Sequence, residues 1–392
     1  MSQPGLGSVR GVHVVLTAAC NLRCAYCYQN AKAKQAMDWR TLRRAVDLLL
    51  SSKQREARLT FYGGEPLLRF DLVRRAVEYA RKRTGGIPWP RFAMITNGTL
   101  LTSEVGAFLA LHRVRTRISF DGVREVQDLR GRGTFRALDG LLGRLRRDHP
   151  AFFRDQVEIA SVFSSRTIAH IAESFDYFLK EGVQEIAVSP ITTWDAEWEA
   201  RRIDDLDRQF EELHRLSLRH LRRTGEVPLV LFRKDRPDPR RGPTPSALCG
   251  VDSGESLVVD VDGEVVACPL FAGSFQTLSP FLRSRLDPMR LGSVHEPDLS
   301  SRLALLPAAV RAARIFDHKE DKRSSYGRCN RCRYARTCHV CPVSIGRIPG
   351  NEDPNRIPDH LCAFNRVSRK WRERFPVRPQ PLDVFAGAVS TR

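Results

Sequence analysis

The chain has 392 residues, of which 42% are hydrophobic, so it is long enough for one large domain and a smaller one, and its composition excludes a disordered tail. Its formal net charge is +19. The charge comes mainly from arginines on predicted helix faces, without the interleaved aromatic residues of a nucleic-acid surface, so nucleic-acid binding is not favoured. The sequence shows neither the apolar segment of a signal peptide nor an apolar run long enough to span a membrane. We therefore expect a cytoplasmic protein whose ten cysteines serve metal or redox chemistry rather than disulfides.

Strand and helix patterns alternate six times along the first half of the chain. Apolar runs predict strands at 12–17, 58–62, 91–95, 117–120, 157–163 and 185–189. Helical patterns follow them: one capped by Asp38, then 71–83, 102–112, 134–147, 167–181 and one near 204–222. This order predicts an α/β fold, a partial (β/α)6 TIM-like barrel, with its chemistry on loops at the carboxyl ends of the strands.

Composition changes near residue 225 and divides the chain. We expect a core barrel at 1–225, a linker rich in Pro and Arg at 226–248, a second domain at 249–371 and a polar tail at 372–392. The second domain begins at the first of seven cysteines and contains a predicted hairpin that turns at Asp262-Gly263. Its small apolar content predicts a fold that depends on metal clusters.

Cys20, Cys24 and Cys27 form a C-x3-C-x2-C pattern in the loop after the first strand. Three thiolates suit a 4Fe-4S cluster with one open iron better than zinc, which takes four ligands in structural sites. With Tyr26 before the last cysteine, the loop resembles the signature of the radical S-adenosylmethionine (SAM) superfamily. The resemblance implies that the open iron binds SAM, which is cleaved reductively to a 5'-deoxyadenosyl radical that abstracts a substrate hydrogen atom.

The resemblance extends to the loops after the next strands. Gly63, Gly64, Glu65 and Pro66 resemble the GGEP motif of the family, which binds the methionyl amino group of SAM. The glycines also allow a close approach of the backbone and a positive φ. Further cofactor contacts are expected by resemblance at Tyr26, Asn97, Ser119, Asp121 and Ser164. The sequence assigns no catalytic residue.

The seven remaining cysteines resemble the SPASM extension of radical SAM enzymes that modify peptides. The resemblance implies two auxiliary 4Fe-4S clusters, the first on Cys249, Cys268 and Cys341, the second on Cys329, Cys332, Cys338 and Cys362. A zinc ribbon on four of these thiols is the alternative, and it would leave the other three without a role. Pro269 follows Cys268 where anaerobic sulfatase maturases carry an aspartate, and nearby Asp260 and Asp262 are assigned to the hairpin.

The predicted function is that of a radical SAM oxidoreductase and peptide maturase, which crosslinks or oxidises a ribosomally synthesised precursor peptide. The expected partners are the peptide, an electron donor such as flavodoxin or ferredoxin, and a separate leader-binding protein, because the first strand starts near residue 12. A radical SAM dehydrogenase acting on a small molecule is the alternative within the superfamily. A cluster- or zinc-containing nucleic-acid-binding protein is the alternative from another class.

Overall fold

The computed structural model describes residues 6–29, 34–87, 89–233, 254–275, 287–312, 322–335, 338, 353 and 355–376. The predicted cluster ligands Cys249 and Cys341 and most of the predicted linker lie outside the described residues.

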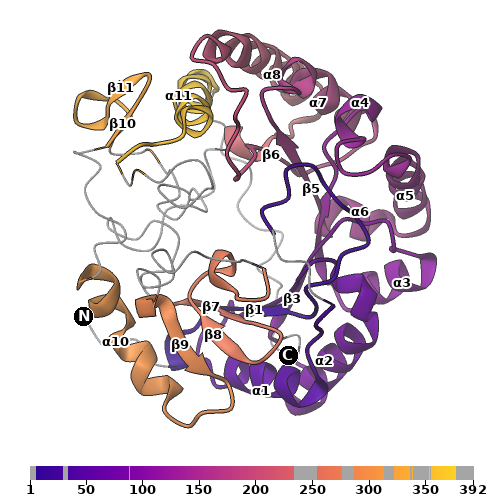
Figure 1. Cartoon of the computed structure of the whole chain (residues 1–392). Coiled ribbons are helices and arrows are strands. Elements are labelled where there is room, and N and C mark those ends of the chain that lie inside the picture. The colour runs from indigo at the N-terminus through magenta and orange to yellow at the C-terminus, as the bar shows by residue number, and fades with distance from the viewer. Residues whose placement is uncertain are drawn as a thin grey trace, which may run out of the picture.

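The first half of the chain forms a curved parallel sheet with helices on its outer side, as Figure 1 shows. The side chains of Val12 and Val14 are fully buried beneath the helices, whereas the intervening His13 belongs to the inner face. The predicted α/β barrel is confirmed. In chain order, its strands are β1 (Gly11–Val15), β2 (Arg58–Tyr62), β3 (Arg91–Thr96), β4 (Arg115–Ser119), β5 (Val157–Phe163) and β6 (Ile186–Pro190).

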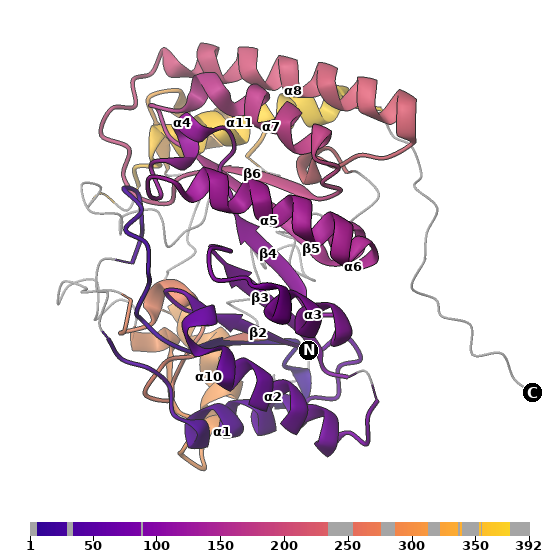
Figure 2. The same cartoon turned by 90° about the vertical axis from the view of Figure 1, so that its right-hand side faces the viewer.

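The outer helices connect consecutive strands, and Figure 2 shows several of them stacked along the outer side of the sheet. At the start of the first, Asp38 Oδ1 accepts a hydrogen bond from Thr41 N at 2.7 Å, as its predicted capping role requires. Two short helices, α4 (Arg124–Gln127) and α6 (Pro150–Gln156), have no counterpart among the elements predicted from the sequence. The helices are α1 (Trp39–Leu50), α2 (Phe70–Arg83), α3 (Ser103–Leu111), α4 (Arg124–Gln127), α5 (Thr134–Asp148), α6 (Pro150–Gln156), α7 (Ile171–Lys180) and α8 (Arg202–Thr224).

The predicted hairpin extends the sheet of the barrel. Strand β7 (Ser256–Val259) pairs in parallel with β1, with Gly11 opposite Ser256, and β8 (Glu264–Val266) and β9 (Arg290–Ser293) add antiparallel strands. Gly263, in the turn between β7 and β8, has a φ of 91°. The full order is β6-β5-β4-β3-β2-β1-β7-β8-β9. One sheet therefore spans both sides of the domain boundary expected from the sequence.

The last described segments are α10 (Leu299–Ala312), the small pair β10 (Arg323–Ser324) and β11 (Gly327–Arg328), and α11 (Asp359–Arg374). Helix α11 packs on α8, where Lys370 Nζ and Trp371 Nε1 donate to Asp207 at 2.6 and 2.9 Å. It continues past residue 372, where a polar tail was expected, and Phe375 is buried. Every helix that the structure describes is too short or too polar to cross a membrane.

Candidate active site at the barrel mouth

The cysteine loop follows β1 at the carboxyl edge of the sheet. Cys20, Cys24 and Cys27 are partly exposed and form no disulfide among the described residues. In the described part of the chain, no group of three or more His, Cys, Asp or Glu side chains is arranged to hold a single metal ion as it stands. The three thiolates of a cubane bind three different irons, so they need not converge on one point. Three cysteine thiols at the mouth of the barrel fit a 4Fe-4S cluster by donor type and by position.

The two glycines after β2 hold the cysteine loop against the end of that strand. Gly64 N donates to Thr17 O at 2.8 Å, and Glu65 N donates to Ala19 O at 2.9 Å. A Cβ atom on Gly63 would lie 2.5 Å from Thr17 O, and one on Gly64 would lie 2.2 Å from Ala19 O. Gly63 also has a φ of 144°. The predicted close approach of the backbone is confirmed, and its partner here is the cysteine loop itself.

Glu65 is fully buried beside this contact and caps the turn that begins at Pro66. Its Oε1 accepts from Leu67 N at 3.0 Å and from Thr96 Oγ1 at 2.7 Å, and its Oε2 accepts from Asn97 N at 2.7 Å. Burial raises the pKa of the Glu65 carboxyl, and these three donors oppose the rise. A carboxylate has about four lone-pair sites, so about one remains for a ligand ammonium.

Asn97 contacts the cysteine loop directly. Its Nδ2 donates to Asn21 Oδ1 at 2.8 Å and lies 3.9 Å from Cys20 Sγ. Asn21 Nδ2 in turn donates to Thr99 Oγ1 at 2.9 Å. The loop after β3 therefore helps to hold the first cysteine in place, and the predicted site residue Asn97 lies beside the thiol of Cys20, a predicted cluster ligand.

Asp121 anchors the other end of the cysteine loop. Its carboxylate is buried and accepts two hydrogen bonds from Arg130, each of 2.9 Å. Val162 N donates to Oδ1 at 2.9 Å, and the Tyr26 hydroxyl donates to Oδ2. Burial, then the Asp121 charge, raises the pKa of Tyr26. These bonds fill about four lone-pair sites of Asp121. The cofactor contact predicted at Asp121 is thus occupied by the chain's own donors, and Arg130 gave no signal in the sequence.

The two predicted serines lie on neighbouring loops. Ser119 ends β4 and is partly exposed, and Ser164 follows β5, where its N donates to Thr167 Oγ1 at 2.9 Å. The next residue, Ser165, donates from Oγ and N to Asp195 at 2.6 and 2.7 Å. This pair joins the loops after β5 and β6, so Ser165 stabilises the barrel mouth.

Cys268, which follows β8, lies near the cysteine loop although 241 positions separate it from Cys27. At Tyr62, the last residue of β2, burial first and then the charges of Cys268 and Cys27 raise the pKa of the hydroxyl. The hydroxyls of Tyr28 and Tyr62 form a hydrogen bond, and the ring of Phe275 packs edge-on against both tyrosines at 6.4 and 5.8 Å. The alternation of β2 places Tyr62 on the inner face of the barrel, a signal that the sequence analysis did not use.

The cysteines near the C-terminus gather around a separate, very small apolar cluster. Ile357 and Leu361 form that cluster, and its partly buried neighbours include Cys329, Cys338 and Cys362. Burial raises the pKa of Cys362 to about 11, with Cys338 contributing, although Ser324 Oγ donates to its sulfur at 3.1 Å. Cys332 N donates to Cys329 O at 3.1 Å. The structure thus places the four predicted ligands of the second auxiliary cluster in one region.

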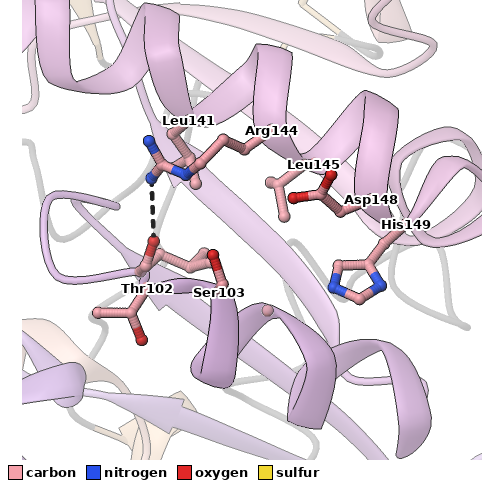
Figure 3. A pocket seen from close by; sticks show the side chains of 9 residues that line it. Thr102, Ser103, Leu141, Arg144, Leu145, Asp148 and His149 are labelled. Atoms are coloured by element: carbon pink, nitrogen blue, oxygen red, sulfur yellow. Dashed lines mark hydrogen bonds between the residues drawn. The ribbon is translucent and has the colours of Figure 1, made fainter.

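A small hollow between α3 and α5 lies apart from this site, on the outer side of the barrel. Thr102, Ser103, Arg144 and His149 are among its lining residues, and Arg144 Nη2 donates to Leu101 O at 3.4 Å (Figure 3). None of its lining residues belongs to the predicted site.

Comparison with known proteins agrees with the geometry of the mouth. Residues 14–148 match the radical SAM superfamily. An uncharacterized protein of Methanocaldococcus jannaschii is 27% identical over 268 residues, which are 67% of this chain and 86% of that protein. A cysteine-type anaerobic sulfatase-maturating enzyme of Clostridium perfringens is 23% identical over 350 residues, covering 81% of this chain and 87% of the enzyme.

Solved structures show the same fold. The structure of anSMEcpe, an anaerobic sulfatase-maturating enzyme, with AdoMet and the Cp18Cys peptide has a TM-score of 0.69 at 19% identity, covering 93% of this chain and 96% of that one. Streptococcus suis SuiB bound to S-adenosylmethionine has a TM-score of 0.56 at 16% identity, covering 90% and 77%.

Residues 14–148 thus carry a radical SAM domain, the class of domain in which a 4Fe-4S cluster and SAM act together. Over most of its length the chain is similar in sequence to a sulfatase-maturating enzyme.

Proposed function

We propose that this enzyme modifies a peptide, by crosslinking or oxidising one of its residues, and that the peptide is a ribosomally synthesised precursor. The observation that carries the proposal is the packing of Phe275, from the segment after Cys268, against Tyr28 beside Cys27 and against Tyr62 on the inner face of the barrel. A substrate held there lies between the radical-forming loop and the thiol of a second cysteine set. The fold relatives anSMEcpe and SuiB have both been solved with peptides, which supports a peptide substrate.

We further propose three 4Fe-4S clusters. The first is held by Cys20, Cys24 and Cys27, and with bound SAM it supplies the radical that takes a hydrogen atom from the substrate. In this assignment Glu65 receives the SAM ammonium, and Asn97 and the Asp121–Tyr26 pair hold the loop in place. The two auxiliary sets are Cys249, Cys268 and Cys341, and Cys329, Cys332, Cys338 and Cys362. The second set is supported by the packing of Cys329, Cys338 and Cys362 against one apolar cluster, with Cys332 N bonded to Cys329 O.

The residue after Cys268 argues against formylglycine formation. Pro269 has no group that accepts a proton, and it begins a short turn of helix. Asp260 is buried and accepts from Val261 N at 2.8 Å and from Ser274 N at 2.9 Å, and Asp262 accepts from Glu264 N at 3.0 Å. The two aspartates therefore stabilise the hairpin, as expected. We propose another oxidation or a crosslink, in the cytoplasm, with electrons from a flavodoxin or ferredoxin and a separate protein for leader recognition.

The experiment is anaerobic coexpression of the enzyme with short peptides encoded beside its gene, followed by mass spectrometry. We expect a loss of hydrogen mass or a new internal bond in one peptide. The Cys24→Ala variant is the matched control and leaves the peptide unchanged. If every peptide is unmodified while the enzyme still forms 5'-deoxyadenosine, the peptide assignment is wrong, and a small-molecule dehydrogenase takes its place.

A further inference from the structure

Several arginines lie on the inner face of the barrel. Leu59 and Phe61 on β2 are fully buried under the helices, so the alternate residues of that strand, among them Arg58 and Tyr62, belong to the inner face. The registers between neighbouring strands continue this face: Gly11 lies opposite Arg58, Arg58 opposite Arg91, Ala93 opposite Arg115, and Ile95 opposite Arg117. Four arginines from three adjacent strands therefore share one surface.

Three of these four arginines are neutralised by carboxylates and one is not. Among the described residues, Arg58 has no ion pair. Its pKa is lowered by burial first and then by the charges of Arg115 and Arg91. The other three are paired: Arg91 with Glu56 at 2.6 Å, Arg115 with Glu185 at 2.5 Å and with Glu158 at 3.5 Å, and Arg117 with Glu158 at 2.7 Å. Of these four arginines, Arg58 alone thus makes no ion pair within the described residues, although the nearby charge of Glu56 acts to raise its pKa.

His13 lies beside Arg58 with a free ring nitrogen. Its Nδ1 is buried and has no hydrogen-bond partner among the described residues. Burial, then Arg58 and Arg117, lowers the pKa of His13 to about 4, so the imidazole is neutral at physiological pH. The edge of its ring faces Tyr62 at 6.5 Å between centroids. A buried polar atom without a partner costs free energy unless a ligand or water satisfies it.

We propose that Arg58, Arg117 and His13 form a carboxylate-binding site on the inner face of the barrel, which selects peptides with an acidic group. Arg117 is 46% exposed, so it can be reached by a ligand while it stays paired with Glu158. The planar guanidinium groups of arginine match a carboxylate in geometry and charge. The neutral His13 can donate from Nδ1 in one of its two tautomers.

The location of this site gives it a role in selectivity. Arg117 also acts on the pKa of Tyr62, which the charges of Cys268 and Cys27 raise. Arg58 begins β2 and Tyr62 ends it, about 13 Å further along the strand. A carboxylate bound by Arg58 and Arg117 therefore holds one part of an extended peptide deep in the barrel while a neighbouring part reaches the radical-forming loop at the mouth. This inference rests on the proposed function, because it specifies which peptide the enzyme accepts. The carboxylate is either an Asp or Glu side chain or the C-terminus of the peptide.

The test measures retention of short peptides by the full-length, cluster-loaded protein under anaerobic conditions, with quantification by mass spectrometry. One pool of amidated peptides carries a single Glu in a varied neutral sequence, a second carries Gln instead, and a third carries Gln with a free C-terminus. We expect the Glu pool or the free C-terminus pool to be retained about tenfold better than the amidated Gln pool. Which of the two is retained identifies the source of the carboxylate.

The matched variants are Arg58→Gln and Arg91→Gln. Each variant alters the first residue of a strand on the same face, but of the two arginines only Arg58 has no ion pair within the described residues. Arg58→Gln should therefore abolish the preference for peptides with a carboxylate, and Arg91→Gln should keep it. Arg58→Gln removes repulsion among arginines and should leave the melting temperature unchanged or raised. Equal retention of all pools, or a preference that survives in Arg58→Gln, would overturn the site. Formation of 5'-deoxyadenosine by the same samples reports separately on radical SAM activity, and mass spectrometry of the coexpressed peptides reports separately on the peptide assignment.

Discussion

The barrel mouth and the cysteine-rich region near the C-terminus position their thiols in different ways. At the mouth, hydrogen bonds from the loops after β2, β3 and β4 hold the cysteine loop, and a large core lies beneath it. Near the C-terminus, Cys329, Cys338 and Cys362 border a cluster that has two buried apolar members among the described residues, Ile357 and Leu361. The difference indicates that the chain itself preforms the mouth, and it leads us to expect that bound metal supplies much of the stability of the second region.

The largest effect is expected from removal of a thiol at the mouth. Cys24→Ala should lower the yield of 5'-deoxyadenosine from SAM and dithionite about a thousandfold, to the level without enzyme, because the cluster loses one of three ligands. The yield is measured by liquid chromatography and mass spectrometry. A yield within a few fold of wild type would remove the catalytic assignment of this loop.

The buried ion pair that anchors the loop should dominate the stability of the mouth. Arg130→Met leaves the buried Asp121 charge without its cation, and we expect a loss of about 3–5 kcal/mol in the free energy of unfolding, measured with urea. The double variant with Asp121→Asn removes the orphaned charge and should recover much of that loss. A single variant as stable as wild type would show that the pair does not anchor the mouth.

The stability of the barrel should fall in acid because of His13. The pKa of this group is about 4 in the folded protein against 6.5 when unfolded, so the unfolded chain binds more protons between these values. The contribution of neutral His13 to the free energy of unfolding is complete above about pH 6.5. It should fall by about 3 kcal/mol by pH 4. In His13→Gln, unfolding in urea should depend less on pH over this window. An identical pH dependence in both proteins would contradict the assignment.

The smallest effect is expected when paired cysteine substitutions in the two regions are compared by their rate of proteolysis. Cys329→Ala combined with Cys332→Ala should speed proteolysis within residues 322–376 about tenfold, since the region loses its metal. Cys20→Ala combined with Cys24→Ala is the matched control and should leave the barrel as resistant as before. Equal protection of residues 322–376 in both double variants would show that this region is stable without metal.

The barrel could be predicted from the sequence because each strand and helix carries a local pattern. The predicted helix at 134–147 corresponds to α5 at Thr134–Asp148, and the predicted strand at 157–163 is β5. The pairing of β7 with β1 joins segments about 245 positions apart, and no local pattern encodes such a contact. The ion pair of Asp121 with Arg130 could not be predicted either, because nothing in the spacing of these two residues indicates that their side chains meet. The site cysteines were identifiable because their spacing is rare, whereas the inner-face arginines became visible only through strand register.

The iron content of the anaerobically reconstituted protein is the most direct test of the proposed cluster content and of the contrast between the two regions. Three cubane clusters predict about twelve irons per chain, with about four lost in the Cys20→Ala and Cys24→Ala double variant and about four lost in the Cys329→Ala and Cys332→Ala double variant. A wild-type value near four would leave only the cluster at the mouth and would contradict the assignment of the second region as an auxiliary-cluster site.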